Sequence, residues 1–126
     1  MHLKDFQTKV ALWVHKCFGD QTAMDKIERH HRFLEEALEL VQSTGCSQSE
    51  AHELVDYVFG RPVGEPEQEV GGTMLTLAAL CHSHGLWMDD CAGNELDRVH
   101  GKIEQIRAKQ AAKPKHSALP GCGEPD

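Results

Sequence analysis

The chain has 126 residues, of which 40% are hydrophobic and 26% are charged, so it suits one compact domain and leaves no room for two ordinary ones. Its formal net charge of -7 argues against a broad nucleic-acid surface or binding to an anionic membrane, since both need dense positive charge. Lys4, Asp5 and Lys9 interrupt the amino-terminal residues, which therefore do not resemble a secretory signal. The longest apolar stretch, residues 70–81, is far shorter than the roughly 20 residues that span a bilayer. We expect a cytoplasmic protein.

Apolar residues recur at helical spacing along most of the chain and strand-like alternation is nearly absent, so we expect an all-α fold. A first helix is predicted over about 3–18 and ends at Gly19. A second begins after Thr22, whose hydroxyl is expected to cap it while Asp25 completes a capping box, and continues to about Ser43.

The middle of the chain predicts two further helices. The third is expected to open with a capping box formed by one of two pairs, Ser47 with Glu50 or Ser49 with Glu53. It closes at Gly60, and Pro66 then suits the first turn of the fourth helix, for which Gly85 is the expected stop.

Asp89 or Asp90 is expected to cap the last predicted helix, which runs to about Ala112. Proline and glycine recur beyond it, so residues 114–126 are expected to form a flexible tail. Together these elements predict a single helical domain over residues 1–113, a bundle of about four to five helices.

The cysteines and histidines give little support for a metal or redox site. The five cysteines are an odd number, are widely spread and include no C-x-x-C pair, so we expect reduced structural thiols. Two histidine-rich groups, Cys81-His82-Ser83-His84 and His30-His31, lack a second half at a known zinc-ligand spacing. A zinc site is therefore a weak interpretation.

Three acids lie inside the apolar pattern of the second predicted helix: Glu35, Glu36 and Glu39. They form either a solvated acidic face, where Arg32 pairs with Glu36, or part of a metal site. The fourth helix favours the metal site, because residues 70–81 carry no charge and are typical of a buried helix, which places Glu69 at the edge of the interior. If the two helices pack antiparallel, Glu36, Glu39 and Glu69 converge, and Mg²⁺ or Mn²⁺ would relieve the repulsion between their carboxylates.

At these residues the sequence resembles the MazG-like family of all-α nucleoside triphosphate pyrophosphohydrolases. Residues 35–39 match the first half of the family signature, E-E-x-x-E. The second half, E-x-x-D, is matched only by its glutamate, Glu69, because Gly72 stands where the family has aspartate. The stretch over 102–109 is similar to the basic segment of the family's last helix, so the resemblance covers about residues 13–109.

The resemblance implies hydrolysis of a nucleoside or deoxynucleoside triphosphate between its α- and β-phosphates, with Mg²⁺ or Mn²⁺ as cofactor and pyrophosphate as a product. It implies that Glu35 positions or deprotonates water. The implied metal ligands are Glu36, Glu39 and Glu69, and the implied phosphate-binding residues are Lys102, Arg107 and Lys109. Trp13 is either a core residue, the commoner case, or an aromatic that stacks on the base, as the resemblance suggests.

The expected assembly is a homodimer or homotetramer. The resemblance points to it, and so does the predominantly apolar fourth helix, whose surface one layer of neighbours in so small a chain does not easily cover. A second class of function stays open, which is a catalytically impaired MazG-like helical dimer that binds nucleotide or a protein partner. Gly72 is the feature that supports this alternative.

Overall fold

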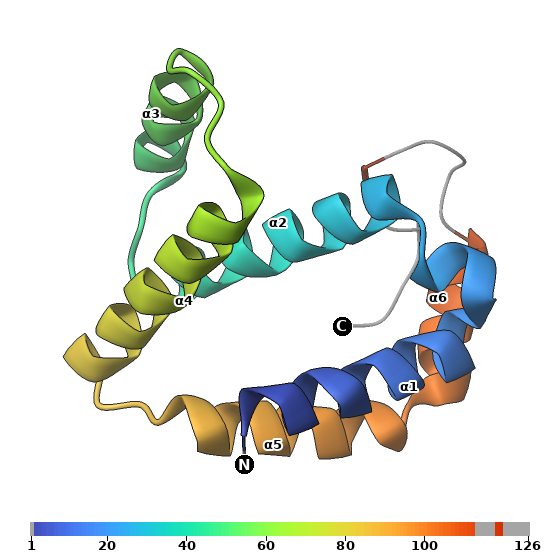
Figure 1. Ribbon diagram of the computed structural model, residues 1–126. Helices are drawn as coiled ribbons and strands as arrows, with labels where there is room; N and C mark the ends of the chain where they lie inside the picture. Colours follow the sequence, from blue (N-terminus) through green and yellow to red (C-terminus); the bar gives the residue numbers. More distant parts are fainter. Residues whose placement is uncertain (1, 113–117, 120–126) are drawn as a thin grey trace. The chain divides into compact units, whose positions relative to one another are not determined.

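The computed structural model describes residues 2–112, 118 and 119, and α-helix is the regular secondary structure found in them (Figure 1). This confirms the all-α prediction. No helix among these residues combines the length and apolar character needed to cross a membrane. The predicted flexible tail over 114–126 lies outside the described residues, apart from Ala118 and Leu119. The helices are α1 (Leu3–Ala23), α2 (Lys26–Ser43), α3 (Gln48–Phe59), α4 (Pro66–Ser83), α5 (Met88–His100) and α6 (Ile103–Ala112).

The chain divides into two compact units, and the division falls within α2 and within α5. The first unit comprises Met1–Glu35 and Ala92–Asp126, and the second comprises Glu36–Cys91. The first unit thus contains α1, α6 and the beginning of α2, whereas α3 and α4 belong to the second.

In the first unit, α1 contains a kink where the sequence predicted its end. Gly19 has φ 79° and ψ 164°, a conformation that residues with a Cβ atom avoid, and the helix resumes beyond it as far as Ala23. The helix packs against α6. Cys17, just before the kink, is 1% exposed, and its thiol lies 3.9 Å from the carbonyl oxygen of Ile103 in α6.

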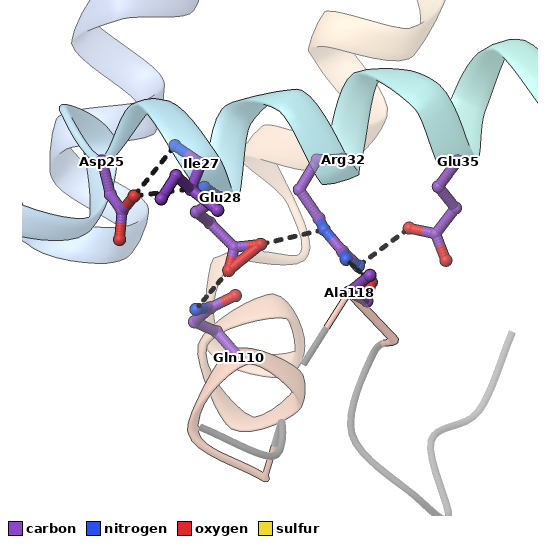
Figure 2. Close-up of polar contacts among 7 residues, drawn as sticks. All are labelled: Asp25, Ile27, Glu28, Arg32, Glu35, Gln110 and Ala118. Atoms are coloured by element: carbon purple, nitrogen blue, oxygen red, sulfur yellow. Dashed lines mark hydrogen bonds and ion pairs between the residues drawn. The ribbon is translucent and has the colours of Figure 1, made fainter. Parts of the chain in front are cut away.

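The start of α2 corrects the predicted cap. Asp25 Oδ1 accepts hydrogen bonds from the backbone N–H groups of Ile27 at 3.1 Å and Glu28 at 3.2 Å (Figure 2). Thr22 does not take this role, because α1 continues through it to Ala23. A carboxylate at this position both satisfies free N–H groups and complements the positive end of the helix.

In the second unit, the predicted boundaries of α3 and α4 are confirmed, whereas α5 begins at Met88, so Asp89 and Asp90 lie in its first turn and neither caps it as predicted. Ser47 and Glu50 form the capping box of α3, so the first of the two proposed pairs is the correct one. Pro66 is the first residue of α4. Gly85 follows the end of α4 with φ 68°, a left-handed conformation that glycine adopts without steric cost.

The last predicted helix is two helices, α5 and α6, so six helices replace the expected four to five in the described residues. The interruption lies at Gly101 and Lys102. Their N–H groups bond to the carbonyl oxygens of Arg98 at 3.2 Å and Val99 at 3.1 Å, each three residues back, which is a tighter turn than the α-helix allows. Glycine, which favours helix less than other residues except proline, permits this break.

Apolar side chains of α3 and α4 are exposed in the single chain, although the sequence predicted that α4 is buried. Phe59 is 85% exposed, Val70 is 65% exposed and Leu75 is 70% exposed. Cys81 is the buried residue of α4. The described residues of one chain therefore leave these apolar side chains of α4 exposed to solvent.

Candidate functional site

A buried carboxylate lies near the start of α2, in the first unit. Glu28 is 5% exposed, and its Oε1 is 2.9 Å from Nε of Arg32, four residues further along the helix (Figure 2). Its Oε2 accepts a hydrogen bond of 3.2 Å from Nε2 of Gln110 in α6. The Nε–H of Arg32 does not meet hydrogen-bond geometry with Oε1, so this contact is an ion pair. Both oxygens of the buried carboxylate thus face a compensating group.

Arg32 links this buried carboxylate to the predicted catalytic glutamate. Its Nη1 donates a hydrogen bond of 3.0 Å to Oε1 of Glu35, and its Nη2 donates to the backbone carbonyl of Ala118. Glu35 is half-buried. The spacings i,i+4 and i,i+3 place Glu28, Arg32 and Glu35 on one face of α2. The proposed surface pairing of Arg32 with Glu36 is therefore replaced by pairing with Glu28 and Glu35.

The three predicted metal ligands are all in the second unit, and all three are exposed. Glu36 and Glu39 lie one turn apart on α2, while Glu69 lies in the first turn of α4. Among residues 2–112, 118 and 119, no three or more His, Cys, Asp or Glu side chains are grouped so that they hold a metal ion. The single chain thus presents these carboxylates on two helices without gathering them at one point.

Glu69 packs closely against the preceding loop, whereas Gly72 has open space around it. The carboxylate of Glu69 lies against Gly64 in the preceding loop, where a Cβ atom would be 3.0 Å from Oε1. A Cβ atom at Gly72 would meet nothing within 4 Å. The space at Gly72 is therefore open to the first atom of a side chain.

The predicted phosphate-binding residues differ in what they contact. Arg107 donates from Nε to the carbonyl oxygen of Cys17 at 2.8 Å, and from Nη2 to the carbonyl oxygen of Lys16. The kink at Gly19 interrupts the hydrogen bonding of α1, so carbonyl groups of the preceding turn need donors from outside the helix. Lys102 is exposed at the turn before α6, and Lys109 is half-buried on α6. Arg107 therefore has a structural contact that the two lysines do not share.

Replacing Arg107 by alanine is expected to reduce the free energy of unfolding by about 1–3 kcal/mol, since charge-assisted hydrogen bonds to two carbonyl groups are lost. Lys102→Ala, at an exposed position, is the matched control and is expected to change it by less than about 0.5 kcal/mol. Urea unfolding of both variants checks this. Equal stability of the two variants would show that Arg107 does not hold the kinked end of α1.

The environment of Cys17 makes its thiol unreactive. Burial raises the pKa of Cys17, and the nearby positive charges of Arg107 and Arg29 oppose this rise without overcoming it. Because the nucleophile is the thiolate, a buried thiol with a raised pKa is a packing residue. The described cysteines Cys17, Cys46, Cys81 and Cys91 form no disulfide with one another.

Trp13 and Arg29 both contact Phe18 at the end of α1. The Trp13 ring meets the Phe18 ring edge to face, with centroids 5.7 Å apart, and the Arg29 guanidinium lies 5.2 Å from the Phe18 centroid. Burial, with the charge of Arg32, lowers the pKa of Arg29. Trp13 therefore has packing contacts in the first unit, and its role in stacking on a base stays a prediction.

The sequence analysis missed Glu28 and Gln110. The spacing of Glu28 to Arg32 is the familiar i,i+4 pattern of a surface ion pair, so it offered no sign that the carboxylate is buried. Gln110 meets it from 82 residues away in sequence, a contact that no local pattern predicts.

Comparison of the chain with protein-family models, with curated proteins and with solved structures finds no match. The proposals below therefore rest on the residues, on their geometry and on the sequence resemblance.

Proposed function

We propose that this protein is a Mg²⁺-dependent nucleoside triphosphate pyrophosphohydrolase of the MazG-like type, acting in the cytoplasm. The observation that carries the proposal is the E-E-x-x-E run at 35–39 on the uninterrupted helix α2, with Glu36 and Glu39 exposed one turn apart. Carboxylates at this spacing can ligate one cation from a single helix. Glu69 is a third carboxylate of the same unit.

The donor set suits the cofactor, since oxygen-only ligation by carboxylates is what Mg²⁺ and Mn²⁺ prefer. Glu36, Glu39 and Glu69 would hold the ion, which supplies neutralisation of phosphate charge. Glu35 accepts a proton from the attacking water or orients it toward the α-phosphorus. Lys102 and Lys109 steady the phosphates, and Arg107 contributes there only in addition to its contact with α1.

We also propose that the active form is a homodimer or homotetramer. The exposed apolar side chains of α3 and α4 support this proposal, because contact with a second copy of the chain would bury them. Sedimentation at micromolar concentration is expected to give a species larger than the 14.0 kDa monomer. A monomer as the only species would contradict the proposal.

The function is tested by incubating the protein with each common ribonucleoside and deoxynucleoside triphosphate in the presence of Mg²⁺. Release of pyrophosphate together with the monophosphate, abolished by EDTA and restored by Mg²⁺ or Mn²⁺, is the expected result. Release of orthophosphate instead would place cleavage at another bond, and no release from any substrate would contradict the enzymatic proposal.

The alternative is a catalytically impaired helical dimer that binds nucleotide or a protein partner, and Gly72 is the observation that favours it.

Gly72→Asp is expected to increase turnover and to lower the Mg²⁺ concentration needed, because the carboxylate enters open space and adds a ligand. Gly71→Asp, equally free of contacts within 4 Å, is the matched control and is expected to bring no increase. If Gly72→Asp is inactive while the wild type is active, the space is occupied in the functional protein.

A further inference from the structure

We infer that Arg32 is a positioning residue that holds Glu35 in place for water activation, and that Glu28 and Gln110 anchor it. This inference rests on the proposed pyrophosphohydrolase function. The four side chains form one chain of contacts in the first unit, from Gln110 through Glu28 and Arg32 to Glu35 (Figure 2).

The contacts of Arg32 explain why this position requires arginine. Its Nε pairs with Glu28 at 2.9 Å, its Nη1 with Glu35 at 3.0 Å, and its Nη2 with the Ala118 carbonyl oxygen. The guanidinium group presents these donors in a rigid planar fork, so fixing one of them orients the others. A lysine ammonium group is a point charge on a flexible stem and has no such fork.

The contact of Arg32 with the buried carboxylate of Glu28 distinguishes the Arg32–Glu35 pair from an ordinary surface ion pair. An exposed pair contributes only about 0.2–1 kcal/mol, and its long side chains keep much of their mobility. The pair Arg98–Glu95 on α5 is bidentate, with Nε 2.8 Å from Oε1 and Nη2 2.6 Å from Oε2, but its side chains are 52% and 58% exposed. Arg32 is instead 21% exposed and is bound to a carboxylate that is 5% exposed and is itself hydrogen-bonded to α6.

The consequence for Glu35 is a defined orientation. Its Oε1 accepts the hydrogen bond from Arg32, which leaves Oε2 as the oxygen that would contact the attacking water in the proposed reaction. A catalytic group must be held to within about 0.5 Å of its productive position, and misplacement by about 1 Å costs on the order of 10²-fold in rate. Glu35 lies directly before Glu36 on the same helix, so this control acts beside a proposed metal ligand.

The test compares Arg32→Lys with the wild type and with Arg98→Lys, which alters a pair of the same i,i+3 spacing. A lysine at this position keeps a charge beside the buried Glu28, so folding is retained while the fork is lost. We expect kcat for pyrophosphate release to fall about 10–100-fold with KM changed less than about threefold, whereas Arg98→Lys leaves both unchanged. In a Glu35→Gln background, Arg32→Lys is expected to cause no further loss.

A second readout does not depend on turnover. NMR relaxation of the Arg32 Nε–H group is expected to show it ordered in the wild type and mobile in Glu28→Gln. An Arg32 Nε–H as mobile in the wild type as in Glu28→Gln, or equal kcat values for Arg32→Lys and the active wild type, would overturn the positioning role alone. Absence of pyrophosphate release by the wild type would instead overturn the proposed function, and the positioning role with it.

Discussion

Replacing Glu36 or Glu39 by glutamine is expected to lower kcat by on the order of 10²–10³-fold while the protein still folds. Each substitution removes one charged oxygen ligand of the proposed Mg²⁺ site, and this ion supplies several kcal/mol of charge stabilisation to the transition state. Both residues are exposed on α2, where neutral replacements of similar shape are expected to change stability little.

Pyrophosphate release across a Mg²⁺ titration, with thermal unfolding of the same samples, checks this prediction. Glu53→Gln is the control, because Glu53 is an exposed glutamate of α3 with no proposed role, and it is expected to match the wild type. If the wild type is active, Glu36→Gln and Glu39→Gln variants that match its activity would show that the ligand assignment is wrong.

Replacing Arg32 by methionine is expected to reduce the free energy of unfolding by about 3–5 kcal/mol. The substitution removes the guanidinium charge 2.9 Å from the Glu28 carboxylate, which is 5% exposed. Most of this loss is the desolvation penalty of the carboxylate that stays buried and not the intrinsic strength of the ion pair. A domain of this size has only about 5–15 kcal/mol of stability, so the effect is large.

The double variant Glu28→Met/Arg32→Met separates these two contributions. Removing both charges together is expected to restore most of the lost stability, because well-packed apolar side chains often replace a buried ion pair at little cost. Urea unfolding of the single and double variants measures the difference. Equal destabilisation by the single and double variants would mean that the carboxylate of Glu28 is compensated by other groups.

The helix boundaries show which features depend on short stretches of sequence. Ser47 with Glu50, Pro66 and Gly85 act through their own backbone or through partners within about one helical turn, and their predicted roles are confirmed. The boundary predictions that were wrong involve competing local signals. Asp25 caps α2 where Thr22 was expected, and Gly101 divides a helix whose apolar stripe continues past it.

The sequence predicted the contacts of individual charged side chains less well than the helix boundaries. The E-E-x-x-E run is readable as a pattern, yet whether its acids meet Glu69 depends on how separate helices come together, and the described single chain does not gather them. The contacts of Arg107 with the end of α1 likewise join residues 90 or more positions apart.

The sequence alone therefore determined the all-α class, the limits of α3 and α4 and the placement of Glu36 and Glu39 one turn apart on one helix, because side-chain periodicity and capping act over a few residues. Only the tertiary structure decided that Glu28 is buried, that Arg32 joins it to Glu35, and that Arg107 supports the kinked end of α1. Burial and long-range pairing depend on which distant surfaces meet, and residue spacing within one helix carries no information about that.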